Sequence, residues 1–126
     1  MLLQAYVDRI NSITTLSGKV SIGFPAQMEG ISSSPYVWIT DVMETAGSSP
    51  VTGPVRQEIE LRLMVAVGTM SLDTLMATRD AVKDVLLNFT PDPEYAPMEF
   101  KNGKMEFSDP GWWFWRDEFV TRYYMR

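Results

Sequence analysis

Two stretches of the chain carry apolar side chains with the spacing of an amphipathic α-helix. In residues 2–14 the apolar positions recur at intervals of three and four, which places on one side Leu3, Tyr6, Val7, Ile10 and Ile13. Residues 72–89 form the second stretch, with Ser71 suited to cap it and Asp73 in the first turn, where negative charge is favourable. We expect the polar side of this helix to carry Arg79, Asp80, Lys83 and Asp84.

Strand-like patterns fill much of the remaining chain. Residues 36–44 are rich in β-branched and aromatic side chains, which favours a strand. Residues 55–67 alternate: odd positions are apolar, apart from Gln57, and the first even positions are Arg56, Glu58, Glu60 and Arg62. Gly68 and Thr69 are expected to end this strand. Residues 45–54 contain turn formers and small polar groups, so they predict a flexible hairpin loop.

The C-terminal part contains a second hairpin signal. In MEFKNGKMEF, residues 98–107, Asn102 and Gly103 suit a two-residue type I′ turn, which predicts strands on both sides with Phe100 opposite Met105. After a further turn at 109–111, the last strand opens with Trp112, Trp113, Phe114 and Trp115.

Together these elements predict an α+β fold, with a mostly antiparallel sheet of about five strands and two helices packed on one face. With 126 residues, the chain is expected to form a single domain over residues 1–126.

Composition excludes several classes of chemistry. The chain has no cysteine and no histidine, which excludes disulfides, Cys/His metal sites, cysteine nucleophiles and histidine-based triads. Its glycines match no phosphate-binding motif, and we expect no cofactor. A net charge of −5 argues against broad capture of nucleic acid. No segment approaches the roughly 20 apolar residues of a membrane span, and the N-terminus lacks signal-peptide features, so we expect a soluble protein made in a cytoplasm.

Glu58 and Glu60 are the candidate pair for acid–base catalysis, because both point to one face of the predicted strand. Arg56 and Arg62 share that face, and nothing in the sequence marks a raised pKa. We therefore prefer a charged interface or solvated face over an acidic-residue hydrolase, and expect no enzymatic activity.

The aromatic run at residues 112–115 would place large rings on both faces of a strand, since successive side chains point to opposite sides. One face is expected to pack on the core. The other face would pack under the chain's own loops, would be covered by a neighbouring subunit, or would form a sugar-stacking platform, as in a carbohydrate-binding module. A platform for bases is disfavoured because two acidic residues follow Arg116 directly. We favour a subunit interface that includes Trp112, Trp113, Phe114, Trp115, Arg116, Arg56, Glu58, Glu60 and Arg62.

The order of these elements resembles the tail terminator, or tail completion, proteins of long-tailed bacteriophages and phage-like particles. The resemblance covers nearly the whole chain. It rests on the N-terminal amphipathic helix, a strand PYVWITDVME, a variable loop, a long strand RQEIELRLMVAVG, a helix SLDTLMATRDAVKDVLLNF and the C-terminal strands. It implies a structural protein, not an enzyme, that assembles as a ring, usually a hexamer, on the head-proximal end of the tail tube. Such a ring ends tube polymerisation and joins the tail to the head.

For this chain, the resemblance implies three protein partners: further copies of itself, the tail tube protein and a head-completion or neck protein. DNA would pass through the lumen without specific binding, and no membrane would be involved. The protein would be assembled in the bacterial host cytoplasm and end in the virion, at the neck-proximal end of the tail. The family transfers no catalytic residues. We expect the loop at 45–54 to contact the tube through Gly47, Ser48, Ser49, Val51 and Thr52.

Overall fold

The computed structural model describes residues 3–23, 35–46, 57–109 and 112–125. These contain the helices α1 (Leu3–Asn11) and α2 (Leu72–Leu86), the short 3-10 helix η1 (Thr14–Leu16), and the strands β1 (Val20–Ile22), β2 (Tyr36–Ala46), β3 (Gln57–Thr69), β4 (Glu99–Asp109) and β5 (Trp112–Met125). The strands form one sheet in the order β1-β2-β3-β5-β4.

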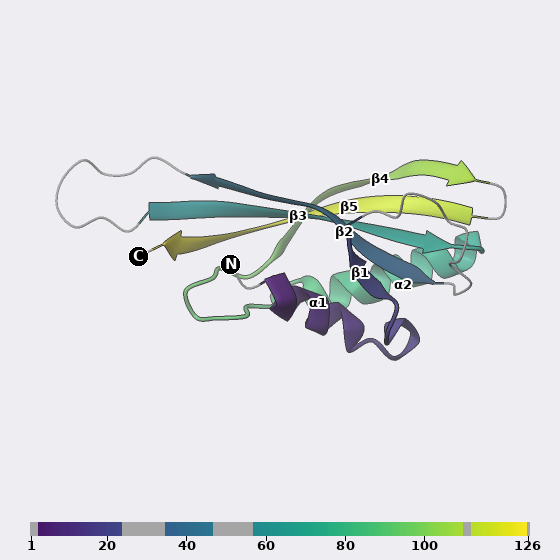
Figure 1. Cartoon of the computed structure of the whole chain (residues 1–126), viewed down its shortest axis with the longest axis horizontal. Coiled ribbons are helices and arrows are strands. Elements are labelled where there is room, and N and C mark those ends of the chain that lie inside the picture. The colour runs from purple at the N-terminus through teal and green to yellow at the C-terminus, as the bar shows by residue number, and fades with distance from the viewer. Residues whose placement is uncertain (1–2, 24–34, 47–56, 110–111, 126) are drawn as a thin grey trace.

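Both helices pack on the same face of this sheet (Figure 1). We call that face the helix face and the opposite one the outer face. The β2–β3, β3–β5 and β5–β4 pairs are antiparallel, and β1 pairs with β2 in parallel. The predicted α+β class, with helices on one side of a mostly antiparallel sheet, is confirmed.

The main core lies between the helices and the sheet. The alternation predicted for β3 is correct: the side chains buried on its helix face are Ile59, Leu61, Leu63, Val65 and Val67. They meet apolar side chains from the two helices, Tyr6, Ile10, Leu75, Val82 and Leu86, all of which are buried. Burial of each such side chain contributes on the order of 1.5–3 kcal/mol, so this layer fixes the position of the sheet.

Helix α2 begins as predicted and ends earlier than predicted. The Ser71 backbone is extended at the cap position, and its side chain accepts a hydrogen bond from the Thr74 backbone N–H at 3.5 Å. The helix stops at Leu86 instead of Phe89, because the next residue is extended and Asn88 has a φ of 64°. Asparagine tolerates this left-handed conformation better than most residues, so it terminates the helix locally.

The predicted turn at Asn102 and Gly103 is wrong. Strand β4 runs through both residues without reversing and pairs with β5, so Phe100 and Met105 lie on one strand instead of facing each other. Glycine is needed at position 103 because the carboxylate of Asp117, its register partner on β5, lies very close to the backbone. A Cβ atom there would lie 1.9 Å from Oδ1 of Asp117. The Asn-Gly preference for a turn is therefore overridden by tertiary packing.

Arg79, predicted on the polar side of α2, is buried, with 9% of its surface exposed. Its Nε donates to Oδ2 of Asp117 at 3.0 Å and its Nη2 to Oδ1 at 2.9 Å, while the guanidinium carbon lies 4.0 Å from the ring centroid of Trp115. The indole Nε1 of Trp115 also donates to Oδ1 of Asp117, at 3.0 Å. This group ties α2 to β5, and charge-assisted bidentate geometry of this kind is among the stronger polar contacts in proteins.

Candidate functional site on the outer face of the sheet

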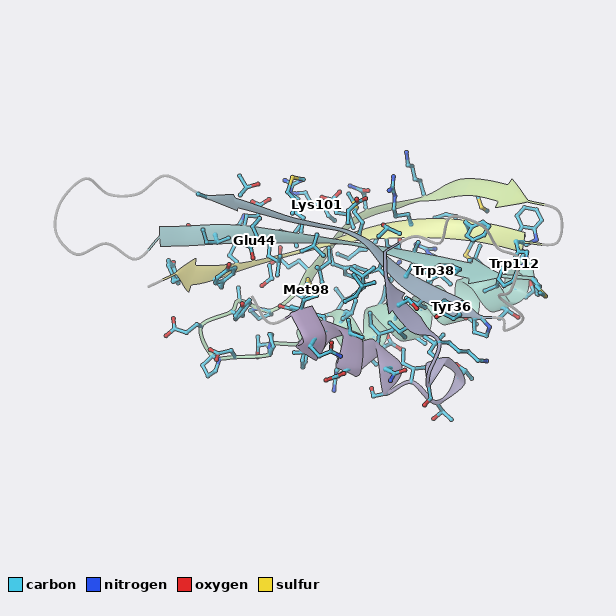
Figure 2. All side chains as sticks on the ribbon, viewed as in Figure 1. Tyr36, Trp38, Glu44, Met98, Lys101 and Trp112 are labelled. Atoms are coloured by element: carbon cyan, nitrogen blue, oxygen red, sulfur yellow. The ribbon has the colours of Figure 1, made fainter. Side chains whose placement is uncertain are left out.

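An aromatic cluster covers one end of the outer face (Figure 2). Trp38 on β2 and Phe114 on β5 are almost fully buried, and Trp112 is 8% exposed. The Trp38 ring lies 4.8 Å from that of Tyr36 and 5.9 Å from that of Phe114, between centroids. Trp112 and Phe114 are therefore covered by other rings of the same chain. We had expected a neighbouring subunit to cover them.

The cluster depends on a glycine that the sequence suggested as a strand end. Gly68 lies inside β3, which ends at Thr69, two residues beyond the strand of residues 55–67 predicted from the sequence. A Cβ atom at Gly68 would fall 2.6 Å from the Trp38 ring and 3.0 Å from the Phe114 ring. The absence of a side chain lets both rings lie directly over the strand backbone.

The other two tryptophans of the run point to the helix face. Trp115 is partly buried beneath Arg79, and Trp113 is 38% exposed. With Trp112 buried on the opposite face, the run does not present its rings side by side to solvent. This arrangement does not provide the flat platform that a carbohydrate-binding module requires. Within the run, Trp113 is the most exposed ring and the one best placed to contact another molecule.

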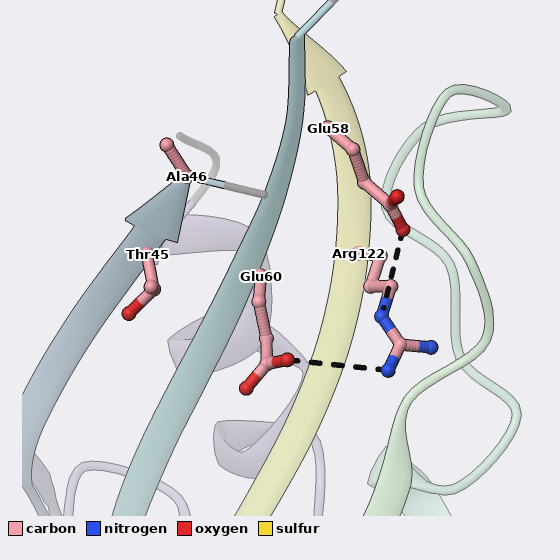
Figure 3. A pocket seen from close by; sticks show the side chains of 5 residues that line it. All are labelled: Thr45, Ala46, Glu58, Glu60 and Arg122. Carbon is pink, nitrogen blue, oxygen red and sulfur yellow. Dashed lines mark ion pairs between the residues drawn. The ribbon is translucent and has the colours of Figure 1, made fainter. Parts of the chain in front are cut away.

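Beyond the aromatic cluster, the outer face carries a ladder of ion pairs across β3 and β5. Arg122 extends between Glu58 and Glu60, with N–O distances of 3.5 Å and 3.9 Å (Figure 3). Arg62 donates from Nε to Glu60 at 2.7 Å and from Nη1 to Glu118 at 2.9 Å. Three of the predicted interface residues, Glu58, Glu60 and Arg62, are therefore brought together. A depression of about 130 Å³ is lined by Glu58, Glu60 and Arg122, together with Thr45 and Ala46.

The electrostatics of the ladder do not suit acid–base catalysis. The hydrogen bond from Arg62 lowers the pKa of Glu60, and the positive charges of Arg62 and Arg122 lower it further against an opposing effect of desolvation. The same hydrogen bond raises the pKa of Arg62. A catalytic acid at neutral pH needs a raised pKa, so Glu60 is an ion-pair partner and not a proton donor.

Sequence reasoning missed part of this face. Arg116, which was predicted at the interface, pairs with Asp41 of β2 at 3.3 Å, and the buried Glu118 accepts hydrogen bonds from Arg62 and from Asn102. The alternation of Arg116, Glu118 and Arg122 along β5 was the available signal, because period-2 spacing places all three on the face that also carries Glu58 and Glu60.

Several predicted positions fall outside the described residues. These are Arg56 and the proposed tube-contacting residues Gly47, Ser48, Ser49, Val51 and Thr52. Thr45 and Ala46, assigned to the loop from the sequence, belong to β2. Across the described ranges, no group of three or more acidic side chains is arranged to hold a metal ion. Neither described helix combines the length and apolar character needed to cross a membrane.

The same fold occurs in a protein of a gene transfer agent particle. It matches a chain of a structure titled "Virion of native gene transfer agent (GTA) particle" with a TM-score of 0.70 and 16% sequence identity, covering 98% of this chain and 95% of that one. A search of curated proteins finds no match. The family model for the phage tail terminator protein matches residues 26–126. The chain belongs to the phage tail terminator family, a family of structural proteins of phage tails.

Proposed function

We propose that the protein forms a ring of six copies that caps the head-proximal end of the tail tube, ends tube polymerisation and joins the tail to the head. The observation that carries this proposal is membership of the tail terminator family over residues 26–126. The predicted partners follow from it: further copies of the chain, the tail tube protein and a head-completion or neck protein. Assembly would take place in the host cytoplasm, and the ring would end in the virion at the neck.

The ladder of the outer face supports the proposed passage of DNA without specific binding. Arg62, Arg122 and Arg116 are each engaged by carboxylates of the same chain. Affinity for DNA comes largely from cationic groups that neutralise phosphates. Arginines already held by Glu58, Glu60, Glu118 and Asp41 are poorly available for that role, so this face would let a phosphate backbone slide past.

Two contact regions remain predictions within this function. Trp113, which is 38% exposed, is proposed to contact a neighbouring protein. The segment at 45–54 is proposed to contact the tube.

The proposal is tested with purified protein and the tail tube protein of the same particle. Native mass spectrometry should give a multiple of 14.3 kDa, alone or after tube addition, and electron microscopy should show tubes that stop growing once the protein is bound. A protein that stays monomeric in both conditions, and leaves tube length unchanged, would refute the function.

A further inference from the structure

Two edges of the sheet are open in the part of the chain that the structure describes. Strand β1 pairs with β2 only at residues 37–39, so the half of β2 at residues 41–46 is paired on its β3 side alone. Strand β4 lies at the opposite margin and pairs with β5 alone (Figure 1). An open edge presents unpaired backbone N–H and C=O groups, which readily add a further strand.

Both open edges carry exposed apolar side chains. Met43 on β2 is 52% exposed, and Phe100 and Met105 on β4 are each 38% exposed. Such residues on an edge strand favour burial against another strand.

The open part of β2 is acidic, whereas the middle of β4 is basic and is flanked in sequence by Glu99 and Glu106. Asp41, with 63% of its side chain exposed, and Glu44 lie on the open part of β2, whereas Lys101 and Lys104 lie exposed on β4. Figure 2 labels Glu44 and Lys101 on these two strands. Antiparallel pairing of two β4 strands about residues 102–103 would place Lys101 opposite Lys104, and the equivalent pairing of two β2 strands would place Asp41 opposite Glu44. Like charges opposite each other are destabilising across strands, so the contact between a β2 edge and a β4 edge is the favoured one.

The topology also allows this contact to repeat. Strand β2 is antiparallel to β3, β3 to β5 and β5 to β4, so β2 and β4 run in opposite directions. A second copy in the same orientation therefore places its β4 antiparallel to β2 of the first and keeps the helices on the same side. Contacts between two different surfaces of identical subunits generate closed rings when the rotation closes.

We propose that neighbouring copies associate by antiparallel pairing of β4 of one copy with residues 41–46 of β2 of the next, with Lys104 opposite Asp41. Both side chains lie on the outer face, since their register partners Arg116 and Met64 do. In this register Met43 faces Asn102, also on the outer face. The inference rests on the proposed ring function and identifies the surfaces that close the ring.

Disulfide trapping tests the register directly. The chain has no cysteine, so the variant Met43→Cys/Asn102→Cys carries only the two introduced thiols. Within one copy these positions are three strand spacings apart, about 14 Å, whereas a disulfide needs Cα atoms within about 7 Å. Oxidation should therefore give a ladder of covalent oligomers that ends at the ring size. The matched control Met43→Cys/Asp80→Cys, with its second thiol on the exposed side of α2, should give no such ladder.

Charge reversal tests the same contact without a covalent bond. Asp41→Lys and Lys104→Asp should each weaken association by about tenfold or more, and the combination of both should restore it. Asp80→Lys, which changes the net charge by the same amount as Asp41→Lys, should leave assembly unchanged. Wild-type rings that form with neither a disulfide ladder nor sensitivity to these reversals would overturn the edge contact while the ring function stands. Wild-type protein that never assembles would overturn both.

Discussion

Gly103→Ala adds a single methyl group whose carbon, in ideal geometry, would lie only 1.9 Å from Oδ1 of Asp117. Two hydrogen bonds converge on this oxygen, from Nη2 of Arg79 at 2.9 Å and from Nε1 of Trp115 at 3.0 Å. The carboxylate must move to admit the methyl group, which leaves the guanidinium of Arg79 buried without its partner. Breaking one side of a buried ion pair costs about 3–5 kcal/mol, a large part of the roughly 5–15 kcal/mol that stabilises a typical domain.

Urea denaturation followed by tryptophan fluorescence measures this loss, since the chain has four tryptophans. With a urea slope of about 1–3 kcal/mol per molar, a loss of about 3–5 kcal/mol should lower the midpoint by about 1–5 M.

The decisive comparison uses the background Arg79→Met/Asp117→Ala, in which both charges are removed. There Gly103→Ala should cost clearly less than in the wild-type background, because the clash with Asp117 is gone and only the close contact with Nε1 of Trp115, at 2.8 Å, has to be relieved. If Gly103→Ala lowered the free energy of unfolding equally in both backgrounds, the cause would be strain in the backbone at position 103. That result would refute the clash with Asp117.

Four further substitutions probe other parts of the molecule by urea denaturation. Tyr6 is buried and its hydroxyl has no hydrogen-bond partner among the described residues, so Tyr6→Phe should leave the free energy of unfolding unchanged or raise it by up to about 1 kcal/mol. Burial raises the pKa of Tyr6 above its usual 10, so wild-type stability should fall as pH rises above 10, and the variant should lose less. The pKa of Glu60 is lowered below its usual 4.5, so the ionised side chain stabilises the fold above that pH and loses this effect in stronger acid. Glu60→Gln should therefore lose less stability than the wild type between pH 7 and pH 3. An equal loss of unfolding free energy in the two proteins would contradict this. Phe114→Ala should lower the free energy of unfolding by about 3–5 kcal/mol, because the ring is fully buried. Trp113→Ala should lower that of the monomer by less than about 1 kcal/mol and weaken assembly instead. A larger loss of monomer stability for Trp113→Ala than for Phe114→Ala would contradict their burial.

The fold class followed from the sequence because its signals are local and repeat. Apolar spacing located both helices, and strict alternation identified which side chains of β3 are buried. The turn predicted at Asn102-Gly103 is wrong because the preference of this pair for a turn is also a local signal. The conformation is decided instead by the packing of Gly103 against the carboxylate of Asp117, fourteen positions later. Tertiary context of this kind overrides short-range propensity.

The candidate site was predictable only in part. Glu58, Glu60 and Arg62 were correctly placed on one face by their period-2 spacing, but their partner Arg122 lies on another strand. No periodicity links residues so far apart in the chain. The same holds for Arg79, whose charge suggested solvent and whose burial depends on Asp117, 38 residues away. Charged side chains are seldom buried unless paired, and the sequence does not reveal the pairing.

The anchorage between Arg79 and Asp117 has a mechanical consequence. Asp117 belongs to the strand next to the β4 margin, and its carboxylate is held by the helical layer. A pulling force along β4 would be transmitted to β5 through the backbone hydrogen bonds between the two strands. From β5 it would reach α2 through the ion pair between Asp117 and Arg79. Load at this margin would therefore be shared by both layers, so that sheet and helices deform as one body instead of peeling apart.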